Sequence, residues 1–113
     1  MADHIKIIPA TGTYVVRAGG AVLGESRDAL ELHEDGHDPV IYFPRKDVEM
    51  VFLDRSDLTS ACPAKGSATH YSIVAKNGTI TDACWSYEDP KPDVAQIKDY
   101  FAFYRTLVAV EKV

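Results

Sequence analysis

Short runs of β-forming residues, separated by turn dipeptides, make up most of the hydrophobic pattern of the chain. The clearest four runs cover residues 13–18, 21–25, 67–75 and 79–87. Gly19-Gly20 separates the first two runs, and Asn77-Gly78 separates the other two. Both dipeptides supply the positive backbone φ angles that tight hairpin turns need. The pattern therefore predicts two antiparallel hairpins.

Further strands are predicted over residues 28–34, 40–43 and 107–110. Residues 28–34 alternate apolar and polar side chains, which favours a strand over a helix. A single helical turn is predicted around residues 46–49, followed by a short strand. Asp93 is expected to cap a short helix that reaches about Tyr100. The apolar face of that helix would carry Val94, Ile97 and Phe101. Many short strands with frequent turns predict a mainly β fold with one or two short helices.

Length and composition are those of one globular domain, which we expect to cover residues 1–113. Hydrophobic residues make up 46% and charged residues 26% of the sequence, which argues against disorder. The net charge of −5 disfavours nucleic acid and anionic membranes as partners, because both require a basic surface. The sequence shows neither a signal peptide nor an apolar run that could cross a membrane. We expect a cytoplasmic protein.

The two cysteines, Cys62 and Cys84, lie 22 positions apart without a CxxC motif. A structural disulfide is not expected in a cytoplasmic chain of this kind. Zinc requires about four ligands at characteristic spacings, and the sequence does not provide them. The scattered histidines are His4, His33, His37 and His70. We expect neither a metal nor a cofactor.

The segment from Cys62 to Gly66 (CPAKG) offers a thiol three residues before an ammonium group. A nearby cation favours the thiolate, so Cys62 is a candidate nucleophile with Lys65 as its activator. Pro63 would stiffen this loop, and Gly66 would let the backbone approach a ligand. Residues 60–66 are expected to be irregular. The alternative is a buried, inert Cys62 beside a lysine that points into water.

Trp85 is the only tryptophan, and the alternation of a strand places it on the face opposite Cys84. Tyr87 lies on the same face as Trp85. If this face is turned inward, both aromatic residues belong to the core. If it lines a cleft, they form a platform for stacking a ligand.

Two further pairs of residues are candidates for a site. Arg45 follows a strand that ends in proline, and its guanidinium is suited to gripping a carboxylate or phosphate. In the alternative, Asp47 caps a short helix while Arg45 pairs locally and Lys46 is solvated. His70 and Tyr71 alternate on their strand, so only one of them can face a given cleft. The acidic residues near turns receive no catalytic role. They are Glu31, Glu34, Asp35, Glu88 and Asp89.

Several of these motifs recur together in one known family. The segments are residues 41–48 (IYFPRKDV), 59–71 with CPAKG, 83–90 (ACWSYEDP), 24–26 and 97–104. In this order they resemble the family called domain of unknown function 427, over about residues 12–111. The resemblance implies a compact, tent-like antiparallel β domain and no established activity. The implied topology is similar to the zinc-bearing domains of some Rab-exchange-factor-like and methionine-sulfoxide-reductase B-type proteins. Because CxxC is absent, their zinc is not expected here.

The preferred functional hypothesis is a module that binds a small anionic molecule. Its ligand-binding residues would be Tyr42, Arg45, Tyr71, Trp85 and Tyr87, together with Lys65. The first alternative is an enzyme that uses Cys62 as a nucleophile activated by Lys65. The second is a scaffold or protein-interaction domain without a pocket. If the chain associates with itself, a symmetric homodimer is the expected assembly.

Overall fold

A computed structural model describes residues 4–113, and residues 1–3 of the expected domain lie outside the described part. The strands are β1 (Ile5–Pro9), β2 (Tyr14–Ala18), β3 (Ala21–Ser26), β4 (Leu30–Glu34), β5 (Val40–Tyr42), β6 (Leu53–Cys62), β7 (Gly66–Ala75), β8 (Gly78–Ser86), β9 (Phe101–Phe103) and β10 (Ala109–Lys112). Three short 3-10 helices join them: η1 (Arg45–Asp47), η2 (Met50–Phe52) and η3 (Pro92–Ile97). The predicted mainly β fold is confirmed.

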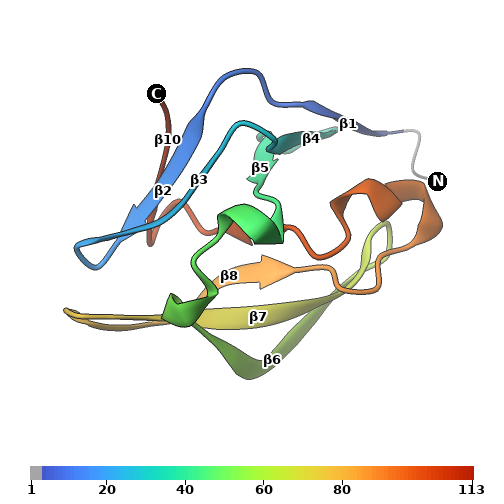
Figure 1. Cartoon of the computed structure of the whole chain (residues 1–113). Helices are drawn as coiled ribbons and strands as arrows, with labels where there is room; N and C mark the ends of the chain where they lie inside the picture. Colours follow the sequence, from blue (N-terminus) through green and yellow to red (C-terminus); the bar gives the residue numbers. More distant parts are fainter. Residues whose placement is uncertain (1–3) are drawn as a thin grey trace.

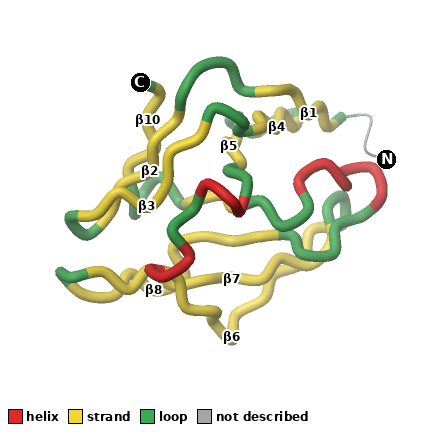
Figure 2. The backbone as a smooth tube through the Cα atoms, viewed as in Figure 1, coloured by secondary structure: helices red, strands yellow, loops and turns green. Residues whose placement is uncertain are grey.

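The strands form three antiparallel sheets, with the strand orders β1-β4-β5, β10-β2-β3 and β6-β7-β8-β9. Figure 1 shows the two three-stranded sheets on one side and strands β6, β7 and β8 on the other. Figure 2 shows the short helical segments at the junctions between these layers. The result is a compact, tent-like β domain.

Both predicted hairpins are present. Strands β2 and β3 pair across Gly19-Gly20, and Ala18 lies opposite Ala21. Strands β7 and β8 pair across the second turn, where Ala75 lies opposite Gly78. The strands predicted over residues 28–34, 40–43 and 107–110 correspond to β4, β5 and β10, with shifts of up to two residues at their ends. Turn residues and strand alternation were therefore sufficient to predict the hairpins and these three strands.

Two strands differ from the sequence-based prediction. Strand β6 is ten residues long and includes Ser60–Cys62, so the expectation that residues 60–66 are wholly irregular was wrong. Only Pro63–Lys65 form the turn into β7. Strand β6 is an edge strand whose side chains are mostly exposed on both faces, so its sequence lacks an apolar alternation. Strand β1, also at an edge, was not predicted.

The predicted helices are shorter than expected. Residues 45–52 form η1 and η2, and neither has a side-chain cap, so Asp47 does not cap a helix. In η3 the capping residue is Lys91, and Pro92 takes the first helical position, which its fixed φ angle suits. The expectation that Asp93 caps this helix was wrong. Phe101 lies in β9 and not on the helix.

Apolar side chains pack against both faces of the four-stranded sheet. The register places Tyr71, Cys84 and Phe103 side by side on one face, where they belong to the larger core cluster. The other face carries His70, Trp85 and Ala102 in the same way. This second face packs against the β1-β4-β5 sheet through a smaller cluster. That cluster contains Leu32, Tyr42, Ala68, Tyr87, Val94, Ile97 and Ala102.

Candidate functional site

The smaller core cluster is incomplete at one end, where it leaves a hollow between β4-β5 and the face of the large sheet that carries Trp85. We call it the central hollow, and its volume is about 340 Å³. Its lining residues are Leu32, Glu34, His37, Asp38, Val40, Tyr42, Ser60, Cys62, Lys65, Trp85, Tyr87 and Tyr104. Five of the seven residues predicted for a site therefore lie together. They are Tyr42, Cys62, Lys65, Trp85 and Tyr87.

Lys65 is the most unusual side chain of this hollow, because only 11% of its side-chain surface is exposed. Its Nζ atom donates a hydrogen bond of 2.8 Å to Oε1 of Glu34, whose side chain is 19% exposed. Burial is the largest single influence on the pKa of Lys65 and acts to lower it, but the hydrogen bond to Glu34 and the attraction of nearby acidic groups together outweigh burial and raise this pKa. The same bond lowers the pKa of Glu34. Both groups are therefore charged near neutral pH.

The turn between β6 and β7 holds Lys65 in this position. The backbone N–H of Lys65 donates to the carbonyl oxygen of Cys62 (3.1 Å), which closes the turn. The carbonyl oxygen of Lys65 accepts a hydrogen bond of 2.9 Å from the backbone N–H of Lys91. Gly66 has a φ angle of +111°, which other residues rarely adopt. The glycine of the CPAKG motif thus allows the backbone conformation at the end of this turn.

Aromatic side chains form much of the wall of the central hollow. The rings of Tyr42 and Trp85 are almost perpendicular, at 89°, with centroids 6.5 Å apart. The ring of Tyr104 lies 4.5 Å from that of Trp85 and is tilted by 46°. Trp85 is half-buried, whereas Tyr87 is buried. Burial raises the pKa of Tyr42 and of Tyr87, so both phenols stay neutral at ordinary pH.

The two cysteines lie in different environments, and both are free thiols. Cys62 is half-buried and lines the central hollow. Cys84 is fully buried in the larger core cluster, where burial raises the pKa of its thiol to about 12. Their side chains lie on opposite faces of the sheet, because Cys84 belongs with Tyr71 while Cys62 faces the hollow. Only Cys62 has access to a ligand in the hollow.

A hydrogen bond that the sequence did not predict lies at the edge of the central hollow. The Oγ atom of Ser60 is 2.8 Å from Nε2 of His70. His70 is 3% exposed and stacks on Tyr104 with ring centroids 6.2 Å apart. Its Nδ1 atom is buried without a hydrogen-bond partner among the described residues. Only the pairing of β6 with β7 brings these two residues together, so no sequence motif could have predicted the contact.

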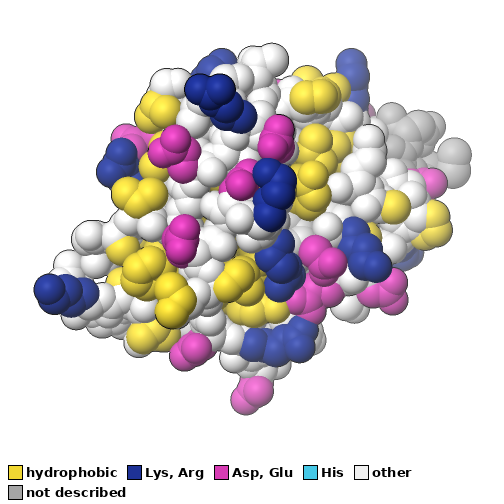
Figure 3. Space-filling view, viewed as in Figure 1, with side chains coloured by type: hydrophobic (Ala, Val, Ile, Leu, Met, Phe, Trp, Pro, Cys, Tyr) yellow, Lys and Arg dark blue, Asp and Glu magenta, His cyan; other side chains and the backbone are white. Residues whose placement is uncertain are grey.

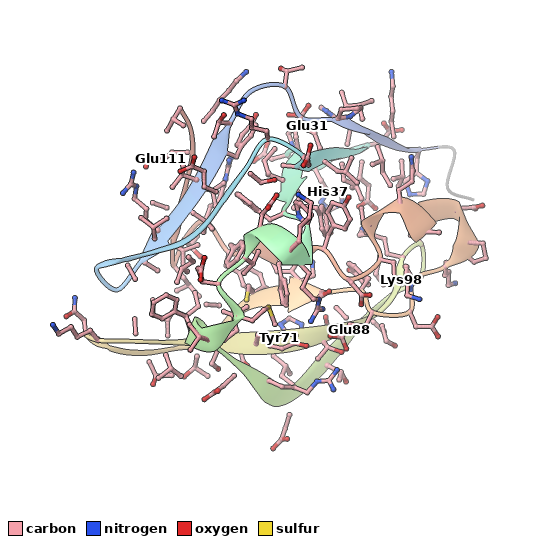
Figure 4. The ribbon with its side chains drawn as sticks, viewed as in Figure 1. Glu31, His37, Tyr71, Glu88, Lys98 and Glu111 are labelled. Atoms are coloured by element: carbon pink, nitrogen blue, oxygen red, sulfur yellow. The ribbon has the colours of Figure 1, made fainter. Side chains whose placement is uncertain are left out.

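Arg45 and Tyr71 do not line the central hollow but meet on the other face of the large sheet. The Nη2 atom of Arg45 donates hydrogen bonds to Ser86 Oγ (3.2 Å) and Glu88 Oε2 (3.0 Å). Its Nε atom donates to the carbonyl oxygen of Asp99 (3.1 Å). The hydroxyl of Tyr71 also donates to Glu88 Oε2, at 2.5 Å. Figure 4 shows Tyr71 and Glu88 close together below the β5–η1 connection, apart from His37.

We call this second group the Arg45 clamp, and it consists of Arg45, Tyr71, Ser86, Glu88 and Asp99. The guanidinium also covers the ring of Phe101, with its central carbon 4.5 Å from the ring centroid. Arg55 forms a further ion pair with Glu88 from the exposed side. The alternative that Arg45 pairs with residues near it in sequence was wrong. Its partners lie more than 40 positions away.

Charges are mixed on the surface of the protein. Lys and Arg side chains alternate with Asp and Glu on the face that Figure 3 shows. Within residues 4–113 there is no group of three or more His, Cys, Asp or Glu side chains that could hold a metal ion. No helix of that part is long and apolar enough to cross a membrane.

Comparison with known proteins identifies a family. A search of curated protein sequences finds no match to the chain. The model of one protein family matches residues 6–113, which is nearly the whole chain and slightly more than the 12–111 expected from the motifs. The tent-like fold agrees with what that family implies. The chain therefore belongs to the family described as domain of unknown function (DUF427).

Proposed function

We propose that this protein is a small-molecule binding domain whose ligand occupies the central hollow. An anionic or other hydrogen-bond-accepting group of the ligand bonds to Lys65, and an apolar part packs against Trp85. The observation that supports this proposal is a buried ammonium group in an aromatic-lined hollow. Polar groups that converge in a mostly apolar pocket are typical of ligand sites.

The hydrogen-bonding capacity of Lys65 favours a ligand at this position. An ammonium group has three N–H donors, and within residues 4–113 the side chain of Lys65 donates to Glu34 only. Two donors are therefore free for a ligand oxygen. Because Lys65 is almost fully buried, a charge-assisted hydrogen bond there is protected from water.

The size of the hollow limits the ligand to a metabolite or a short side chain. Ligand pockets usually measure roughly 300–1,000 Å³, and the central hollow lies near the lower end of this range at about 340 Å³. Arg45, which the sequence suggested as a second anion-binding residue, is engaged in the Arg45 clamp. Of the residues that the structure describes, Lys65 is therefore the one buried cation of the proposed site.

Thermal shift with a panel of small carboxylates and phosphates tests the proposal, because a ligand that binds only the native state raises the melting temperature. Binding is then followed by the fluorescence of Trp85, the only tryptophan. Replacing Lys65 alone would leave the partly buried Glu34 carboxylate without its ammonium partner and with only His4, among the described residues, at ion-pair distance. The informative variant is therefore the neutral pair Lys65→Met with Glu34→Gln.

We expect this double variant to fold and to lose the ligand response. Lys46→Met is the matched control, because it removes an exposed cation outside the hollow. If the double variant binds the same compounds as the wild type, Lys65 has no part in recognition and the proposal fails. Failure of every compound in the panel to shift the melting temperature also argues against it.

A second candidate function is catalysis in the same hollow. Cys62 lines it, and the Ser60–His70 hydrogen bond has the length expected between a nucleophile and its base. The ammonium of Lys65 is shared with Glu34, which reduces its ability to stabilise a Cys62 thiolate. We therefore prefer binding to catalysis.

Thiol alkylation with iodoacetamide separates binding from catalysis by Cys62. If Cys62 is a nucleophile, it reacts at near-neutral pH much faster than an ordinary thiol. For a binding site we expect reaction at an ordinary rate, which a bound ligand slows. Cys84 serves as the internal control, because its burial and raised pKa should prevent reaction until the protein unfolds.

A further inference from the structure

We propose that the ligand of the central hollow is a small zwitterion, with its carboxylate on Lys65 and an alkylated ammonium group against Trp85 and Tyr104 beside Asp38. This inference rests on the proposed function and specifies the class of its ligand. The observation that supports it is that the two ends of the hollow carry different side chains: an ammonium with free donors at one end, and aromatic rings with a carboxylate at the other.

A second, smaller hollow shows which residues lie at which end. This side hollow has a volume of about 190 Å³ and adjoins the central one. Four residues line both hollows: Asp38, Val40, Trp85 and Tyr104. These four therefore form the end of the central hollow that faces the side hollow. Lys65 and Glu34 line the central hollow alone and so belong to the other end.

At the end that faces the side hollow, the rings of Trp85 and Tyr104 meet at an angle, and Tyr42 adjoins Trp85 from within the central hollow. Trp85 is close to perpendicular to Tyr42 and is tilted by 46° against Tyr104. A cation is attracted to the face of an aromatic ring within about 6 Å of its centroid, and tryptophan is the strongest partner. An alkylated ammonium group suits such a corner because its methyl groups also bury apolar surface.

The carboxylate of Asp38 adds a negative charge at this end. Glu34 is compensated by Lys65, whereas Asp38 forms no ion pair with any described residue. Arg105 is the cation of the side hollow, and it forms no ion pair with Asp38. His37 also lines the central hollow, and both His37 and Asp38 are exposed. Within the central hollow itself, Lys65 and Glu34 balance each other at one end, and Asp38 is the charged side chain at the aromatic end, with Arg105 beyond it in the side hollow.

A series of three trimethylammonium carboxylates tests the inference, with one, two or three methylene groups between the charges. Each compound is compared with its carbon isostere, in which a tert-butyl group replaces the trimethylammonium group. The isosteres are 3,3-dimethylbutanoate, 4,4-dimethylpentanoate and 5,5-dimethylhexanoate. Choline serves as the cation that lacks a carboxylate. Dissociation constants are measured by calorimetry and by the fluorescence of Trp85.

We expect the best-fitting zwitterion to bind roughly 2- to 30-fold more tightly than its isostere, which corresponds to the usual strength of a cation–π contact. The preference for the positive charge should disappear in Trp85→Leu. Tyr104→Phe keeps the ring and is the matched control, so it should retain the preference. Trp85→Phe, which also keeps a ring, should show a smaller preference and remains informative if Trp85→Leu does not fold.

Two outcomes would overturn the inference. If the isosteres bind as tightly as the zwitterions, the positive charge is not recognised; the proposed function then stands and only the ligand class is wrong. If neither zwitterions nor choline bind while other anions from the panel do, the aromatic end takes no cation. The Lys65→Met/Glu34→Gln variant separately tests the proposed function, because it removes the carboxylate contact and leaves the aromatic corner intact.

Discussion

Two cation–carboxylate pairs lie on opposite faces of the large sheet, and they differ in how fully the cation is used. Arg45 donates to Ser86, Glu88 and Asp99 and covers the ring of Phe101. Among the described residues, Lys65 donates to Glu34 alone, and it borders a hollow.

The number of hydrogen bonds that each cation makes distinguishes a structural cation from a candidate binding residue. In sequence the two look alike, because each follows a proline within a motif of the same family. In the structure the guanidinium of Arg45 connects η1, β8 and the loop before β9, which leaves it little capacity for a ligand. The ammonium of Lys65 keeps two donors free. Unused hydrogen-bonding capacity next to a hollow is the feature that favours binding.

The largest expected effect is loss of stability in Arg45→Ala. The change removes charge-assisted hydrogen bonds and leaves the Glu88 carboxylate with fewer partners. We expect the free energy of unfolding to fall by about 2–3 kcal/mol, measured by urea denaturation. Arg45→Lys should recover only part of this loss, because an ammonium cannot reach three acceptors in the fork geometry of a guanidinium. A loss below about 0.5 kcal/mol would be typical of an exposed pair and would return Arg45 to the candidates for ligand binding.

A smaller effect is expected for Lys65→Met. It leaves Glu34 partly buried without its partner, which should cost about 1–2 kcal/mol in the same measurement. The double variant Lys65→Met/Glu34→Gln removes both charges and should recover most of that loss. If the double variant is no more stable than the single one, the pair is not what stabilises this end of the hollow.

The sequence was sufficient for the elements whose signals are local. Gly19-Gly20 and Asn77-Gly78 place both hairpins, because turn chemistry and strand alternation need only neighbouring residues. Strand β6 was largely missed because an exposed edge strand has no apolar face to mark it. The sequence also gave no reason to expect three short 3-10 helices in place of longer helices.

The candidate site was predictable only in part, for a similar reason. Alternation correctly placed Trp85 opposite Cys84, and the family motifs grouped Lys65 with aromatic residues. The partners of the cations were not predictable, since Glu34 and Glu88 were treated as ordinary turn residues. Lys65 and Glu34 are 31 positions apart and lie in different sheets, so only the packing of the sheets brings them together.

The pH dependence of stability gives a further test of the Lys65–Glu34 pair. The pKa of Glu34 is lowered below its ordinary value of 4.5 in the folded protein. Its contribution to stability is therefore complete above pH 4.5 and is lost as the pH falls through the folded pKa. The wild type should therefore lose stability relative to Lys65→Met/Glu34→Gln over that acid range, because the double variant has no charge at either position. Because Glu88 titrates in both proteins, a difference that stays constant below pH 4 would mean that Glu34 gains nothing from Lys65.

The smallest effect on stability is expected for a substitution of Lys46. This residue forms ion pairs but is exposed, so it tests whether an ion pair without burial contributes to stability. Its Nζ atom lies 3.0 Å from a carboxylate oxygen of Asp28 and equally close to Asp47. These hydrogen bonds, that to Asp28 foremost, raise its pKa, yet its side chain is 65% exposed. Water and salt screen such a pair, so Lys46→Ala should leave the urea midpoint unchanged within error. Asp47 also accepts a 2.6 Å hydrogen bond from buried Ser26. A clear drop in the midpoint would show that Lys46 supports this bond, and that burial alone does not distinguish the cations of this fold.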